Sequence, residues 1–129
     1  MRRCNFILYV RDQEHSTAFY AKVLDLAPTL HVPGMTEFTL TDGAILGLMP
    51  ERGIKALLGA ALNDPAAATG IPRCELYLTV DDPQAYHLRS LAAGGVELSP
   101  LLDRDWGDRA AYSRDPDGHV LAFAETMRC

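Results

Sequence analysis

The sequence is poor in cysteine, and its cysteines form no pattern that suits a metal or a disulfide framework. The three cysteines are Cys4, Cys74 and Cys129. An odd number without paired spacing argues against a disulfide-stabilised secreted domain and against a zinc site. We therefore expect a reduced, cytoplasmic environment.

An excess of basic residues and long apolar runs are also lacking. The chain has 12 Lys and Arg against 17 Asp and Glu, a formal net charge of -5 at pH 7. Nucleic acid and anionic membrane surfaces are therefore not expected partners. No segment approaches the roughly twenty apolar residues of a membrane helix. Charged residues interrupt the apolar run near the N-terminus, so we expect no signal peptide.

What the sequence does contain is a repeat. Residues 5–12 (NFILYVRD) resemble residues 75–82 (ELYLTVDD), and residues 41–49 (TDGAILGLM) resemble residues 116–124 (PDGHVLAFA). In each copy an alternating apolar run predicts a strand that ends at an aspartate, and later a turn precedes another strand. The pattern therefore predicts two copies of one strand–helix–strand–strand–strand unit.

Length and composition place both copies in one domain. A chain of 129 residues with 48% apolar and 22% charged residues is ordinary for a single globular domain. Within this single domain, residues 1–129, we assign 1–50 to the first module, 51–72 to a connector and 73–129 to the second module. Paired copies usually form their site in the cleft between them, because neither copy buries its apolar face alone.

The aspartates that close the first strand of each copy predict where the helices begin. Asp12 is expected to cap a helix over residues 13–25. Asp82 is expected to cap a helix that begins at Pro83, where the missing N–H of proline costs nothing.

Two further helical features follow from the sequence pattern. We expect Leu88, Leu91 and Ala92 to form the inward face of the second helix, and His87 to be a surface residue. In the connector, only residues 54–62 predict a short helix.

The order of the elements and three short motifs resemble a known family. The motifs are Phe19-Tyr20 in the first helix, Trp106-Gly107, and the turn at residues 115–118 (DPDG) before the last strand. With the duplicated order, they make the chain similar to the vicinal oxygen chelate superfamily, which includes glyoxalase I, bleomycin resistance proteins, fosfomycin resistance proteins and extradiol dioxygenases. The resemblance implies an α+β fold of two βαβββ modules that form curved, incomplete barrels, and it implies a homodimer.

The resemblance also implies where a divalent metal would bind in the members that use one. The ligand positions on the first and last strand of each half correspond to Asn5, Gly47, Glu75 and Ala122. Only Glu75 is a convincing ligand, whereas a reactive metal normally takes about three protein ligands. We therefore expect no cofactor and disfavour a divalent metal, although a bulge that turned Glu125 inward would restore a site.

Strand alternation predicts what lines the cleft instead. We expect a largely apolar surface with one carboxylate and two phenols, in which small residues such as Gly47 leave room for a ligand. The candidate ligand-binding residues are Asn5, Tyr9, Met49, Glu75, Tyr77, Trp106 and Arg109.

The sequence leaves the roles of several candidates open. An ionised Glu75 needs a partner, which Arg109 or a cationic ligand would supply; otherwise it would hold a proton and suit a catalytic base. Tyr9 and Tyr77 either pack with a satisfied hydroxyl or contact a ligand. Trp106 is either a wall on which a ligand stacks or a buried loop anchor.

These features favour one function and leave two alternatives. The favoured function is a metal-independent small-molecule binding protein, similar to bleomycin resistance proteins, that takes an apolar, aromatic or cationic compound. The first alternative is a glyoxalase-type lyase or isomerase in which catalytic Glu75 removes a proton alpha to a carbonyl, while Asn5 or a recruited metal holds the oxyanion. The second is a structural partner without a ligand, which the small residues expected in the cleft argue against.

Overall fold

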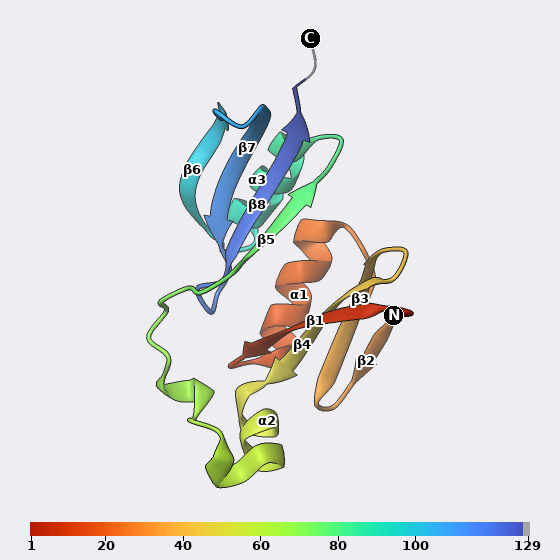
Figure 1. Ribbon diagram of the computed structural model, residues 1–129, viewed down its shortest axis with the longest axis vertical. Coiled ribbons are helices and arrows are strands. Elements are labelled where there is room, and N and C mark those ends of the chain that lie inside the picture. The colour runs from red at the N-terminus through yellow and green to blue at the C-terminus, as the bar shows by residue number, and fades with distance from the viewer. Residues whose placement is uncertain (128–129) are drawn as a thin grey trace. The chain divides into compact units, whose positions relative to one another are not determined.

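The first module forms a four-stranded mixed sheet (Figure 1). The computed structural model describes residues 1–127. The elements of this module are β1 (Cys4–Val10), α1 (Gln13–Leu24), β2 (Leu30–Val32), β3 (Met35–Thr41) and β4 (Ala44–Pro50). The strand order is β1-β4-β3-β2, in which β1 runs parallel to β4 and the other neighbours are antiparallel.

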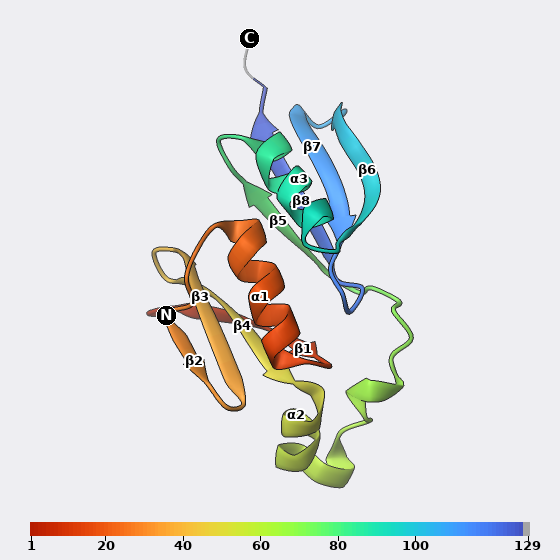
Figure 2. The same cartoon turned by 180° about the vertical axis from the view of Figure 1, so that it is seen from behind.

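The second module repeats this arrangement. Its elements are β5 (Glu75–Thr79), α3 (Pro83–Ala92), β6 (Val96–Asp103), β7 (Asp108–Arg114) and β8 (Val120–Thr126). The strand order is β5-β8-β7-β6, again with one parallel pair, β5 and β8. Figure 2 shows α3 lying across one face of this sheet. The predicted α+β fold of two βαβββ modules is confirmed.

The connector contains one α-helix, α2 (Glu51–Leu58), followed by two 3₁₀ turns, η1 (Gly59–Ala61) and η2 (Pro65–Ala67). α2 begins earlier than the predicted residue 54, because Pro50 gives an extended entry and the acidic Glu51 favours a helix N-terminus. Residues 1–69 and the residues from 70 onward form two compact units, except that residues 22–24 group with the second unit.

Both module helices begin as the repeated aspartates predict. The Asp12 carboxylate accepts from the backbone N–H of His15 at 3.0 Å, and the Asp82 carboxylate from that of Ala85 at 3.1 Å. α1 ends slightly earlier than predicted, because Asp25 adopts the left-handed conformation with φ 54°. In the described part of the chain, no helix is both long and apolar enough to cross a membrane.

The first sheet has one face that meets α1 and one open face. Thr36 of β3 is fully buried, and its hydroxyl oxygen lies 2.9 Å from that of Thr17 in α1. Leu8 of β1 is buried on the same face. Alternation places Ile7, 42% exposed, and Tyr9, 38% exposed, on the open face.

The buried face of α3 differs from the prediction. Leu88, expected to face inward, is 53% exposed, whereas His87 and Ser90 are 2% and 0% exposed. The Ser90 hydroxyl lies 2.8 Å from that of Ser113 on β7, and His87 Nε2 lies 2.8 Å from a carboxylate oxygen of Glu97. The predictions of an inward Leu88 and a surface His87 are therefore wrong, because polar groups that find partners can be buried in place of apolar ones.

Candidate functional site

The open face of the second sheet carries Glu75 and Tyr77. The pairing of β5 with β8 and of β8 with β7 is uninterrupted, so Tyr77, Ala122 and Tyr112 stand in one row across the sheet. Glu75 lies two residues before Tyr77 on β5 and therefore points to the same side. Ser113 points to the other side, where it meets α3.

Tyr77 is the centre of a polar cluster on this open face. Its hydroxyl donates to Asp108 Oδ2 at 2.6 Å and accepts from Trp106 Nε1 at 3.0 Å. These two bonds fix the phenol and the indole relative to each other. Trp106 is 56% exposed, so the alternative of a buried loop anchor is wrong.

The environment of Tyr77 keeps its phenol protonated at neutral pH. Partial burial raises the pKa of Tyr77, and the hydrogen bond to Asp108 raises it further, whereas the bond from Trp106 lowers it. A neutral phenol beside a carboxylate acts as the donor of their shared hydrogen bond. The bond from Trp106 uses one lone pair of the Tyr77 oxygen, so the other stays available to a ligand.

Glu75 acts electrostatically on a second phenol, that of Tyr112. Partial burial raises the pKa of Tyr112, and the negative charge of Glu75 raises it further, while Arg104 lowers it. The Arg104 guanidinium carbon lies 5.1 Å from the centre of the Tyr112 ring. The same guanidinium donates to the Ala110 carbonyl at 2.8 Å and to the Ser99 hydroxyl at 2.6 Å. Arg104 therefore holds the Tyr112 ring in place on the open face of the sheet.

Arg109, predicted as a partner of Glu75, lies on the opposite face of the sheet. Along β7 it has the same orientation as Ala111 and Ser113, whose side meets α3. Its Nε donates to Asp103 Oδ1 at 2.8 Å, and this hydrogen bond raises the pKa of the guanidinium. We therefore leave Arg109 out of the site.

The open face of the first sheet carries Asn5, Tyr9 and Met49, with Tyr9 and Met49 directly paired in register. Asn5 Nδ2 donates to Glu37 Oε2 at 3.1 Å, and Asn5 Oδ1 accepts from Arg3 Nε at 3.1 Å. Glu37 is also 3.7 Å from the Arg3 guanidinium, with its side chain only 16% exposed. The Asn5 amide is therefore already bonded to both members of an ion pair.

The first sheet has no free space at Gly47. A Cβ atom added at this glycine would lie 3.0 Å from Ile7 Cγ1 and 3.4 Å from Met35 Sδ. The expectation that Gly47 leaves room for a ligand is wrong, because these two neighbours occupy the space.

The residues at the metal positions implied by the resemblance do not suit a divalent ion. Gly47 and Ala122 have no donor side chain, and the Asn5 amide is engaged as described. Only Glu75 offers a carboxylate. Within residues 1–127, no group of three or more His, Cys, Asp or Glu side chains is placed to hold a metal ion. The donor set thus falls short of the about three ligands that a reactive metal needs.

The bulge that would bring Glu125 into such a site is not present. β8 pairs with β7 in unbroken register over its whole length. Glu125 therefore keeps the orientation of Phe123, which packs against Tyr86 of α3 with ring centroids 5.4 Å apart.

Sequence reasoning missed three polar residues of the open faces: Glu37, Asp108 and Tyr112. It applied strand alternation only to the first and last strand of each module. The same alternation on β3 and β7 locates them, because Glu37 pairs with Gly47 and Tyr112 with Ala122.

Comparison of the chain with known proteins identifies its family. The family model described as the Glyoxalase/Bleomycin resistance protein/Dioxygenase superfamily matches residues 3–123. The chain is also 30% identical over 125 residues to an uncharacterized protein of Mycobacterium tuberculosis, an alignment that covers 94% of this chain and 72% of that protein.

Solved structures give the same fold. A glyoxalase-related enzyme from Fulvimarina pelagi matches with a TM-score of 0.80 and 25% identity, covering 95% of this chain and 86% of that one. A protein of unknown function from Agrobacterium tumefaciens matches with a TM-score of 0.77 and 25% identity, covering 98% of this chain and 95% of that one.

Proposed function

The chain belongs to the Glyoxalase/Bleomycin resistance protein/Dioxygenase superfamily, and we propose that it is a metal-independent member that binds a small aromatic or cationic molecule. The observation that carries this proposal is the chain of hydrogen bonds from Trp106 through Tyr77 to Asp108 on the open face of the second sheet. This chain of hydrogen bonds holds the exposed Trp106 ring on the same face as the Asp108 carboxylate.

The polar groups of this face are mainly acceptors. The only N–H of the Trp106 side chain is used by Tyr77, and the only O–H of Tyr77 is used by Asp108. The second oxygen of Asp108 and both oxygens of Glu75 can only accept when ionised. A ligand that brings N–H donors and positive charge therefore complements the face, whereas an anion is repelled.

The aromatic groups supply the apolar part of the interaction. Trp106 and Tyr77 are 56% and 38% exposed, so their rings are accessible to a flat ligand. A cation placed over an indole face gains about 0.5–2 kcal/mol, depending on how far it is desolvated. Tyr9 and Met49, on the open face of the first sheet, remain candidates for apolar contacts with a ligand.

The test uses Trp106, the single tryptophan of the chain. Its indole N–H gives one unambiguous cross-peak in a nitrogen-15 NMR spectrum. Phenethylamine, phenethyl alcohol and phenylacetate share one ring and differ in charge. We expect a saturable shift of the cross-peak with the amine, a weaker response to the alcohol and none to the acid.

Matched variants separate specific binding from general charge attraction. Asp108→Asn and Glu75→Gln should each weaken phenethylamine binding several-fold, whereas Asp42→Asn, which removes an exposed carboxylate from a turn of the first module, should not. Equal binding of all three probes, or equal loss in the Asp42 variant, would contradict the proposal.

The second candidate function is a lyase or isomerase, and the neighbourhood of Glu75 and Tyr112 favours it. A carboxylate on the same face as a protonated phenol can remove a proton alpha to a carbonyl while the phenol donates to the oxygen that becomes negative. Asn5 is less suited to that role because its amide is bonded to Arg3 and Glu37. Exchange of alpha protons with deuterated water, abolished in both Glu75→Gln and Tyr112→Phe, would establish this reaction.

The homodimer implied by the family is part of the proposal. Sedimentation velocity distinguishes a dimer from a monomer of 14.1 kDa. A concentration-independent monomer would contradict it.

A further inference from the structure

The first module has a hollow that the proposed function does not use. It lies at the carboxyl ends of the parallel strands β1 and β4 and has a volume of about 560 Å³. Three segments line it: the start of α1, the β2–β3 hairpin and the start of α2. The lining residues are Arg11, Asp12, Gln13, Glu14, His31, Val32, Pro33, Gly34, Pro50, Arg52 and Gly53.

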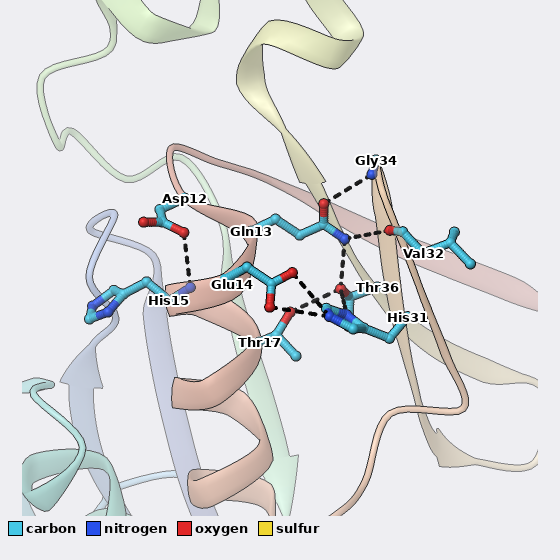
Figure 3. A network of polar contacts seen from close by, with 9 residues as sticks. All are labelled: Asp12, Gln13, Glu14, His15, Thr17, His31, Val32, Gly34 and Thr36. Atoms are coloured by element: carbon cyan, nitrogen blue, oxygen red, sulfur yellow. Dashed lines mark hydrogen bonds and ion pairs between the residues drawn. The ribbon is translucent and has the colours of Figure 1, made fainter.

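One wall of the hollow is fixed by the side chain of Gln13 (Figure 3). Gln13 Nε2 donates to the Val32 carbonyl at 2.8 Å and to the Thr36 hydroxyl at 3.0 Å, and Gln13 Oε1 accepts from the Gly34 N–H at 3.0 Å. All hydrogen-bonding groups of this amide except one lone pair are thus used to join α1 to the hairpin. The wall is therefore formed before any ligand arrives.

The acidic residues on the rim are engaged within the protein. Asp12 caps α1 by accepting from the His15 N–H. Glu14 lies 3.1 Å from His31 Nε2, and His31 Nδ1 lies 2.8 Å from the Thr36 hydroxyl (Figure 3). Asp12 thus has its partner within α1, and Glu14 has its partner on the β2–β3 hairpin.

The basic residues on the rim are placed differently. Arg11 and Arg52 line both this hollow and a second one of about 380 Å³, so they stand at the boundary between the two. Arg11 donates to the Ala68 carbonyl at 3.0 Å and lies 3.7 Å from Glu51. Arg52 is exposed and forms no ion pair or hydrogen bond through its side chain within residues 1–127. Arg52 is therefore the charge that a ligand can reach without displacing a partner.

We infer that this hollow is a second binding site, which takes a small molecule bearing a carboxylate or a phosphate group. The oxyanion binds the Arg52 guanidinium, whose planar set of N–H donors suits both groups, and Arg11 adds positive charge beside it. The body of the ligand lies in the larger hollow against Pro33 and Pro50. This site differs from the open face of the second sheet, which favours cations.

Titration with inorganic phosphate and with acetate tests the inference on the whole chain at low ionic strength and neutral pH. The backbone amides of Gly34 and Gly53 line the hollow and serve as NMR reporters. Both signals should shift along saturable curves with at least one of the two anions, and the two titrations show which oxyanion is preferred. The Trp106 indole signal should stay in place, which separates this site from the one proposed above.

Three arginine variants give the controls. Arg52→Ala should weaken binding about tenfold or more, as expected for loss of a charge-assisted hydrogen bond, and Arg52→Lys should retain part of it because the charge remains. Arg114→Ala removes an exposed arginine from β7 of the second module and should change nothing. Failure of both anions to saturate the Gly34 and Gly53 shifts, or an equal loss in the Arg114 variant, would overturn the inference.

Discussion

Tyr77 and Asp108 share a hydrogen bond of 2.6 Å between a phenol and a carboxylate. Tyr77 lies on the edge strand β5, whereas Asp108 is the first residue of β7. The bond therefore spans the sheet from its edge strand, across β8, to the loop that carries Trp106. Removing either partner should loosen the position of the indole as well as the phenol.

The Tyr77–Asp108 hydrogen bond should affect the titration of the Tyr77 phenol. Its folded pKa is raised above 10.0, first by partial burial and then by Asp108. Because the folded state holds this proton more tightly, the associated stability is fully present below the unfolded pKa and is lost as the pH rises through the folded pKa. We expect alkaline destabilisation to begin above about pH 10. Phenolate absorbance and thermal melts against pH measure the two effects.

Two variants show which part of the alkaline titration belongs to Tyr77. Tyr77→Phe should remove one late-titrating phenol, and Asp108→Asn should return the pKa of Tyr77 towards its ordinary value without a large change in shape. Tyr112 also titrates late, so the signal of Tyr77 is the difference between wild type and the phenylalanine variant. An unchanged titration curve in Asp108→Asn would show that Asp108 does not control the phenol.

Gly47 and Gly53 give a matched pair of predictions about packing. Gly47→Ala should destabilise the protein by about 1–3 kcal/mol through overpacking, because the new methyl group would lie 3.0 Å from Ile7 Cγ1. At Gly53, within α2, the same change meets nothing closer than Met49 Cε at 3.7 Å. Gly53→Ala should therefore stabilise by about 0.5–1 kcal/mol. Chemical denaturation should show a lower free energy of unfolding for Gly47→Ala and a higher one for Gly53→Ala.

The fold was predictable from sequence because its signals are local and repeated. The two aspartate caps and the alternating strands recur in both copies, and both are found where the pattern places them. The site was predictable in part: alternation on β5 correctly brings Glu75 and Tyr77 to one face. Alternation on β7 places Arg109 on the opposite face of the sheet from Glu75, so its charge does not make it the partner of that carboxylate.

The burial of polar residues on α3 could not be predicted from the sequence, because it depends on partners that are distant in the chain. His87 and Ser90 are polar, so an apolar-face argument puts them outside, yet both are buried, with Glu97 as the partner of His87 Nε2 and Ser113 as the partner of the Ser90 hydroxyl. A hydrophobicity pattern contains no information on such pairs. Hydrogen-bond partners more than a few residues apart can be assigned only once strand register is known.

Gln13 provides a prediction about the β2–β3 hairpin. Gln13→Ala removes three hydrogen bonds, to Val32, Thr36 and Gly34. At a net value of about 0.5–1.5 kcal/mol each, the protein should lose roughly 1.5–4.5 kcal/mol. Hydrogen exchange of the Gly34 amide should accelerate more than that of strand amides. Gln84→Ala, an exposed glutamine of α3, is the control and should leave both quantities unchanged.

The Ser90 and Ser113 hydroxyls, 2.8 Å apart and both 0% exposed, allow a double-mutant cycle. Either single change to alanine leaves the other hydroxyl buried without its partner, and should cost about 1–3 kcal/mol. The double variant removes both polar groups and should be more stable than the sum of the single losses implies. Strictly additive losses would mean that each hydroxyl finds another partner, and that the pair does not by itself explain why α3 buries a polar face.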